Sequence, residues 1–90
     1  MTLFHGEDFH IMLPSLGVEV VFRNRSAQRS ADVVLMRGGV VVNNRTKLNR
    51  QLSHLIIDAV GEGDEGVYTV TNPEKPEDVR RITLIVRGTG

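Results

Sequence analysis

The 90-residue chain contains no cysteine and no tryptophan. The lack of a thiol excludes disulfides, cysteine-based zinc sites and a cysteine nucleophile. Small secreted domains generally carry disulfides, so the absence also weighs against secretion. Two N-glycosylation sequons weigh the other way, because they begin at Asn24 and Asn44, where loops or strand ends are expected. The two observations thus favour different compartments, a reducing cytosol and the cell surface, and both remain alternatives.

The chain also lacks net charge and long apolar runs. Eleven Lys and Arg balance eleven Asp and Glu, so the overall electrostatics favour neither nucleic acid nor an anionic membrane as a partner. No apolar run approaches the roughly 18 residues of a spanning helix, so we expect no direct membrane insertion. Residues 1–8 lack the basic and apolar regions of a signal peptide. A chain of this length forms one compact domain.

What the chain does contain is a series of short alternating segments separated by turn residues. Their recurrence every 8–15 residues predicts an antiparallel β-sandwich and no alternation of helices with strands. The clearest of these segments are residues 17–23, 32–36, 55–60, 67–70 and 79–87, while residues 9–13 alternate loosely.

Residues 55–70 are the most informative stretch, because two strands are joined by an acidic turn that reads D-x-G-x-Y from Asp64 to Tyr68. This pattern resembles the corner between strands E and F of immunoglobulin-like domains. In that family the tyrosine stands two residues before the second core cysteine, and its hydroxyl bonds back to the backbone just upstream. The resemblance implies a bond from Tyr68 to a backbone group between Gly61 and Asp64, with Val70 in place of the cysteine.

The resemblance spans residues 9–87 and implies an all-β, immunoglobulin-like antiparallel β-sandwich of variable or intermediate type that lacks the inter-sheet disulfide. Residues 1–8 are expected to be a flexible N-terminal end or a short first strand, and residues 88–90 a C-terminal tail.

Three apolar residues are expected to meet at the centre of this sandwich. Residues 17–23 match strand B, with Phe22 in place of the first core cysteine, and residues 32–39 match strand C, with Leu35 in place of the core tryptophan. We therefore expect Phe22, Leu35 and Val70 to pack together.

An ion pair is expected at the corner. In many variable-type domains an arginine near the start of strand D pairs with the aspartate of the corner. Arg45 is the matching candidate for Asp64, and Arg50 is an alternative.

Two patterns in the chain imitate ligand sites. Residues 61–66 match G-x-G-x-x-G, but a dinucleotide site needs a helix after the glycines, and a strand is expected there. A calcium site from Glu62, Asp64 and Glu65 is conceivable, although acidic turns are usually just solvated.

The remaining candidates for chemistry are isolated. His5, His10 and His54 have no partner at metal-ligand spacing and are interpreted as surface residues. The lone Arg37-Gly38-Gly39 is interpreted as a turn, since RNA binding would need repetition or a basic face. We expect no catalytic residue, no cofactor and no metal, and the protein is not expected to be an enzyme.

The resemblance implies a protein-recognition or adhesion module of a larger, cell-surface protein. Its partner would be another protein or a second copy of itself in a homodimer, bound through the sheet of strands C, F and G. The alternative is an intracellular structural module of a cytoskeletal or muscle-type protein, whose lack of cysteine suits a reducing cytosol. Alternation predicts these outward residues as interface candidates: Val34, Met36, Val67, Thr69, Arg81, Thr83 and Ile85.

Charge is unevenly distributed along the chain. The first 50 residues carry seven Lys and Arg against four Asp and Glu, and the last 40 carry four against seven. The basic group Arg23, Arg25 and Arg29 and the acidic group Glu74, Glu77 and Asp78 are predicted to lie in loops at one end of the sandwich. They would then neutralise each other within one molecule or pair between molecules.

Overall fold

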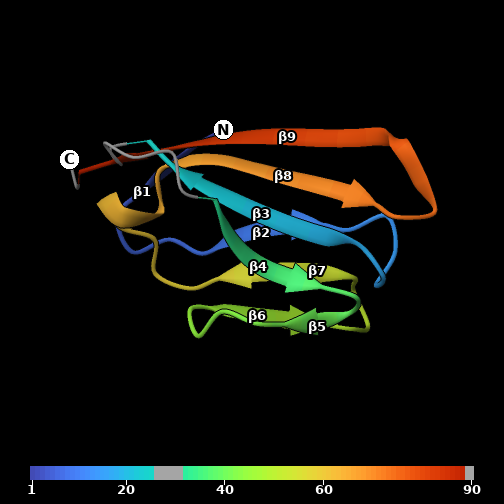
Figure 1. Ribbon diagram of the computed structural model, residues 1–90. Coiled ribbons are helices and arrows are strands. Elements are labelled where there is room, and N and C mark those ends of the chain that lie inside the picture. Colours follow the sequence, from blue (N-terminus) through green and yellow to red (C-terminus); the bar gives the residue numbers. More distant parts are fainter. Residues whose placement is uncertain (26–31, 89–90) are drawn as a thin grey trace.

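The computed structural model describes residues 1–25 and 32–88. Within these ranges the chain forms β-strands and one turn of 3-10 helix, and the strands lie in two facing layers (Figure 1). The elements are β1 (Thr2–Phe4), β2 (Phe9–Met12), β3 (Glu19–Asn24), β4 (Val33–Arg37), β5 (Val40–Val41), β6 (Thr46–Asn49), β7 (His54–Ile57), η1 (Glu62–Asp64), β8 (Gly66–Asn72) and β9 (Lys75–Arg87).

The larger sheet has the strand order β1-β9-β8-β3-β4-β5, and the smaller has the order β2-β7-β6. All pairings are antiparallel except that of β1 with β9, which is parallel. Of the two alternatives for the N-terminal residues, the structure has the short first strand, since Thr2 lies opposite Ile85. The predicted all-β sandwich is therefore the observed architecture.

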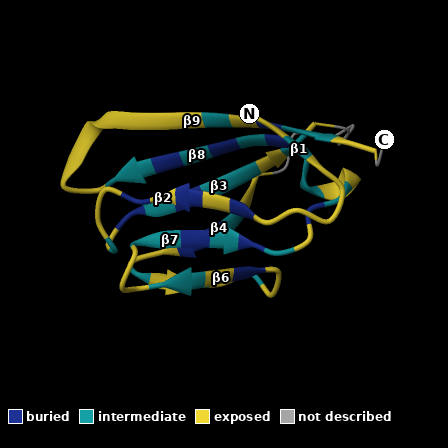
Figure 2. Cartoon of the chain, turned by 180° about the vertical axis from the view of Figure 1, so that it is seen from behind, coloured by how far each residue is buried: buried dark blue, intermediate teal, exposed yellow. Residues whose placement is uncertain are grey.

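The core lies between the sheets and is built from alternate residues of facing strands. Figure 2 shows buried segments in β2, β7 and β8, whereas β9 is mostly exposed. Tyr68 is the largest of the side chains that are almost completely buried. Its ring meets Phe9 edge-on at a centroid distance of 5.1 Å and stacks on Phe22 at 4.5 Å. One aromatic residue thus contacts side chains of both sheets, two residues before Val70, which takes the place of the family's second core cysteine.

The predicted assignment of residues 17–23 to strand B is wrong. In the immunoglobulin arrangement strand B shares a sheet with E and D, whereas C lies beside F. Here β2 pairs with β7, and β3 pairs with β8 and β4, so residues 9–12 are strand B and β3 is strand C. Alternation identifies a strand but not its sheet, and both segments alternate.

The corrected assignment changes the centre of the core. The register places Val20, not Phe22, opposite Val70, while Phe22 lies opposite Tyr68. Leu35 is buried, but it belongs to β4, which β3 separates from β8 and therefore from Val70. The predicted packing of Phe22, Leu35 and Val70 is therefore not the arrangement at the centre of this sheet. Instead, Val20 lies between Val70 and Met36.

The expectation that Met36 faces outward is also wrong, because its side chain is 0% exposed. Val21 lies opposite Val34 and Val20 opposite Met36, so β4 contains one residue more than β3 at this point. Such a bulge breaks the alternation of side chains. Leu35 and Met36 consequently both face the core.

The two charged groups lie at opposite ends of the sheet and not at one end. Asn24 at the end of β3 lies opposite Gly66, the first residue of β8, whereas Glu74 lies two residues beyond Asn72, the last residue of β8. Seven extended residues separate these ends by about 20 Å. Arg23 and Arg25 therefore cannot neutralise the acidic group Glu74, Glu77 and Asp78 within one molecule. Arg29 lies outside the described residues.

Candidate functional site

The outer face of the larger sheet carries six of the seven predicted interface residues. Thr83, Val67 and Arg23 form one row across β9, β8 and β3. Arg81, Thr69, Val21 and Val34 form the next row, and Ile85 alternates outward from the buried Leu84. We call this surface, defined by Val21, Arg23, Val34, Val67, Thr69, Arg81, Thr83 and Ile85, the outer face.

Sequence reasoning missed Val21 and Arg23 as members of this face. The signal was present, since Val21 alternates with the inward Val20, but their strand had been assigned to the other sheet. With Val21 included, the centre of the face contains Val21, Val34 and Val67, which are all half-buried. The rim includes Arg81 and Thr83, which are exposed.

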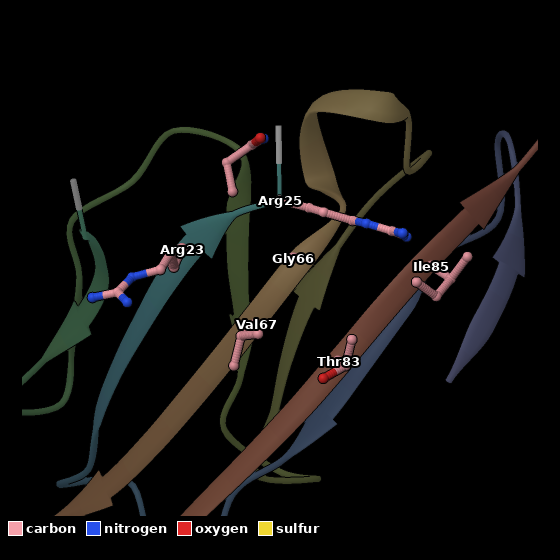
Figure 3. Close-up of a pocket in the computed structure, with 7 residues that line it drawn as sticks. Arg23, Arg25, Gly66, Val67, Thr83 and Ile85 are labelled. Atoms are coloured by element: carbon pink, nitrogen blue, oxygen red, sulfur yellow. The ribbon is translucent and has the colours of Figure 1, made fainter. Parts of the chain in front are cut away.

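Two adjoining hollows open on the outer face, and Arg23 and Val67 line both of them. The larger has a volume of about 520 Å³, and the smaller has about 380 Å³. Figure 3 shows the larger hollow, with Val67, Thr83 and Ile85 on neighbouring strands and the Arg25 side chain reaching toward β9. An apolar floor edged by guanidinium groups suits an apolar or acidic side chain of a protein partner.

Two ion pairs link β3 to β4 and to the residue just before it, on the β4 side of the outer face. The Nε atom of Arg23 donates to Asp32 at 2.8 Å, and Nε of Arg37 donates to Glu19 at 2.8 Å. These side chains are between 34% and 65% exposed, so each pair adds little to stability and mainly fixes the position of the charges.

The corner next to this sheet has the bonds that the resemblance implied. The Tyr68 hydroxyl donates to the backbone carbonyl of Asp64 at 2.6 Å. The Asp64 carboxylate accepts hydrogen bonds from Arg45 at 2.6 Å and from the backbone N–H of Gly61 at 2.9 Å. Arg50 instead donates to the carbonyl of Gly39 at 3.5 Å. Arg45 is thus the partner of Asp64, and this network fixes the start of β8.

The Tyr68 bond gives a prediction for stability. Replacing Tyr68 with phenylalanine keeps the ring but removes the hydroxyl that satisfies the Asp64 carbonyl. We expect the free energy of unfolding to fall by about 1 kcal/mol, the usual net value of such a bond. Urea denaturation of both proteins measures this difference. Equal stability would mean that the hydroxyl bond contributes nothing to the corner.

Alkaline pH provides a second measurement on the same residue. Burial, followed by the nearby Asp64 charge, raises the pKa of Tyr68 well above its ordinary value, while Arg45 opposes the shift. A raised folded-state pKa means that its stabilisation is complete below about pH 10 and is lost as the pH rises further. The wild type should lose this stability above about pH 10, and the phenylalanine variant should not. Tyr68 is the only tyrosine, so tyrosinate absorbance reports its titration directly.

Two carboxylates of the acidic turn, those of Asp64 and Glu65, accept hydrogen bonds within the fold. Asp64 binds Arg45, and Glu65 accepts a 2.7 Å hydrogen bond from the backbone N–H of Val86. Among residues 1–25 and 32–88, no group of three or more His, Asp or Glu side chains is arranged to hold a metal ion. The glycines of residues 61–66 are followed by β8 and not by an α-helix, as the interpretation of that pattern required.

In the described part of the chain, no helix is long and apolar enough to cross a membrane.

The two sequon asparagines differ in their surroundings. Asn44 is exposed in the turn before β6. Asn24 is half-buried at the end of β3, and its amide nitrogen donates to the carbonyl of Gly63 at 2.7 Å. Asn44 is therefore the more open of the two acceptors.

No protein-family model and no curated protein matches the sequence. Solved structures do match. The chain is similar to the ZIG-8 IG1 homodimer structure, with 16% identity, a TM-score of 0.68, and coverage of 98% of this chain and 78% of that one. It is similar to the extracellular domain of the voltage-gated sodium channel beta4 subunit, with 14% identity, a TM-score of 0.66, and 99% and 90% coverage.

The first immunoglobulin domain of the mouse polymeric immunoglobulin receptor matches with 14% identity, a TM-score of 0.62, and 99% and 89% coverage. At these identities the likeness establishes the fold. The protein is an immunoglobulin-like β-sandwich without the inter-sheet disulfide, since it contains no cysteine.

Proposed function

We propose that this domain is a protein-recognition or adhesion module of a larger cell-surface protein and is not an enzyme. It binds a protein partner through the outer face, and the partner favoured here is a second copy of the chain. The observation that carries the proposal is the composition of that face, which has a half-buried valine centre, two hollows and a polar rim. This is the anatomy of an interface core with its rim.

The charge distribution favours a second copy as the occupant. A two-fold axis through the outer face, with the strands of the two copies running in opposite directions, places the end of β3 over the β8–β9 turn of the other copy. Arg25 of each copy then meets the acidic group Glu74, Glu77 and Asp78 of its partner, while Arg23 stays paired with Asp32 of its own copy. The separation of these charges within one molecule leaves them available for pairing between molecules.

The solved neighbours support the same kind of partner. The structure of ZIG-8 IG1 is a homodimer, and ZIG-8 also forms an IG1–IG1 heterodimer with RIG-5. The sodium channel beta4 extracellular domains form parallel homodimers to which a role in cell–cell adhesion is attributed.

A charge exchange tests the two-fold arrangement. Mass is measured by light scattering, in the presence of a metal chelator, from low to high micromolar concentration. We expect a dimer for the wild type that weakens with added salt, since exposed charges are screened. Arg25→Glu and Glu77→Lys should each dissociate it, and an equimolar mixture of the two variants should associate again.

The control is Met12→Glu, which introduces a charge on the smaller sheet at a residue that is 67% exposed. This variant should dimerise like the wild type. Met36→Glu is unsuitable as a probe, because Met36 is buried and a charge there would disrupt the core. A monomer at every concentration, or a dimer indifferent to both exchanges, would rule out self-association in this arrangement.

The alternative function is an intracellular structural module of a cytoskeletal or muscle-type protein, which the absence of cysteine favours. Glycan occupancy separates the two functions. In the natural full-length protein, a glycosidase-sensitive mass that is lost in Asn44→Gln would place the domain on the secretory route. An unmodified Asn24 and Asn44 would favour the intracellular module.

A further inference from the structure

Two histidines that are 44 residues apart in the sequence meet on the exposed side of the smaller sheet. His10 in β2 and His54 in β7 have their Nδ1 atoms 3.4 Å apart. Their rings are nearly perpendicular, at 86°, with a centroid distance of 5.5 Å. Phe9 and Leu55, the inward neighbours of these residues, are buried, so alternation directs both imidazoles outward. This surface lies on the opposite side of the sandwich from the outer face.

The register explains why the two rings converge. His10 lies opposite Ile56, and His54 lies opposite Met12, so the histidines are diagonal neighbours across the strand pair. Diagonal side chains of this length can reach one another. The sheet itself therefore sets the spacing of the rings, and no sequence spacing rule reveals it.

The separation of the Nδ1 atoms matches that of two ligands of one metal ion. Two imidazole nitrogens bound tetrahedrally at about 2.0–2.1 Å from a metal lie about 3.3–3.4 Å apart. A direct N–H···N hydrogen bond is ordinarily shorter, at about 2.7–3.2 Å for the related N–H···O bond. The observed 3.4 Å thus fits a shared ion better than a shared proton.

The charges beside the pair are compatible with a bound cation. Lys47 in β6 lies in the same row as His10, across Ile56. Its ammonium is held by the carboxylate of Asp58 at 2.5 Å, which offsets its positive charge near the imidazoles. Both histidines are accessible to an ion from solvent, since His10 is exposed and His54 is half-buried.

We propose that His10 and His54 chelate a late first-row transition-metal ion, with copper(II) bound more tightly than zinc(II). Imidazole suits both ions, and their order follows the general series of metal affinities. Water completes the coordination. Magnesium, which prefers oxygen ligands, does not bind. This site is independent of the proposed function, because it lies on the other sheet.

Calorimetric titration of the purified chain tests the site, using copper(II), zinc(II) and magnesium separately at neutral pH. We expect one copper or zinc ion per chain and no heat with magnesium. His10→Asn and His54→Asn should each weaken copper and zinc binding at least about tenfold, since each removes one of two ligands. His5→Asn, which removes the remaining histidine, should bind as the wild type does.

Thermal melting provides a second readout. Zinc should raise the melting temperature of the wild type and of His5→Asn but not of the other two variants, because an ion that binds only the folded chain stabilises it. Both histidines lie outside the core, so melting without metal should show that all three variants fold. Failure to bind copper and zinc, or unchanged affinity in His10→Asn and His54→Asn, would overturn the proposal.

Discussion

Replacing Gly66 with alanine is expected to lower the free energy of unfolding by more than about 3 kcal/mol. Gly66 begins β8 with a φ of +150°, a conformation that residues with a side chain rarely adopt. A Cβ atom there would lie 2.0 Å from the carbonyl oxygen of Arg23 and 2.9 Å from Cε1 of Phe22. The oxygen belongs to the backbone, so it cannot move aside without displacing β3.

The clash has no easy relief, because Gly66 is held from both sides. It lies opposite Asn24 of β3 and opposite Leu84 of β9, which is completely buried. Moving β8 away from β3 would press it toward β9 and would pull Tyr68 away from the corner. Strain and lost pairing therefore add to each other.

Gly63→Ala is the matched control, since a Cβ at Gly63 meets no atom within 4 Å and its φ is not positive. Urea denaturation of the two variants should show Gly63→Ala within about 1 kcal/mol of the wild type. If Gly66→Ala were as stable as Gly63→Ala, the close approach of β3 to β8 would not limit the residue at this position.

The corner could be predicted from the sequence because its determinants are local. Asp64, Gly66 and Tyr68 lie within five residues, and the bond from the Tyr68 hydroxyl reaches back only four residues, to Asp64. Even the more distant Arg45 was identified, since the resemblance supplied its place. Short-range geometry of this kind survives the loss of the family's cysteines.

The strand order could not be predicted in the same way. Residues 9–12 and 19–24 both alternate, and their sheets are decided by pairing with β7 and β8, which are distant in sequence. The core cysteines and tryptophan ordinarily mark these strands. Without them, alternation favours the longer and more regular residues 17–23 as strand B, and this shifts each assignment from there to β6 by one strand.

Two further features depend on contacts that a sequence pattern does not contain. The bulge at Leu35 is visible only in the register of β4 against β3, and it turns Met36 from the outer face into the core. The pairing of His10 with His54 is visible only in the register of β2 against β7. Both are consequences of long-range pairing.

The three phenylalanines of the chain test the corrected strand order, since each occupies a different environment. Phe9→Ala is expected to cost about 3–5 kcal/mol, the range for removing a fully buried phenylalanine. Its side chain is 1% exposed and its ring meets Tyr68 edge-on, so the cavity would open between the sheets. Phe22 also stacks on Tyr68 but is only half-buried, so Phe22→Ala should cost about half as much.

Phe4 in the edge strand β1 is 51% exposed and supplies the control, with an expected cost below about 1 kcal/mol. Urea denaturation of the three alanine variants should therefore rank the loss of stability as Phe9, then Phe22, then Phe4. Had residues 17–23 been strand B, Phe22 would occupy the centre of the core and its removal would be the costliest. A larger loss for Phe22→Ala than for Phe9→Ala would therefore contradict the placement of β2 beside β7 at the centre of the sandwich.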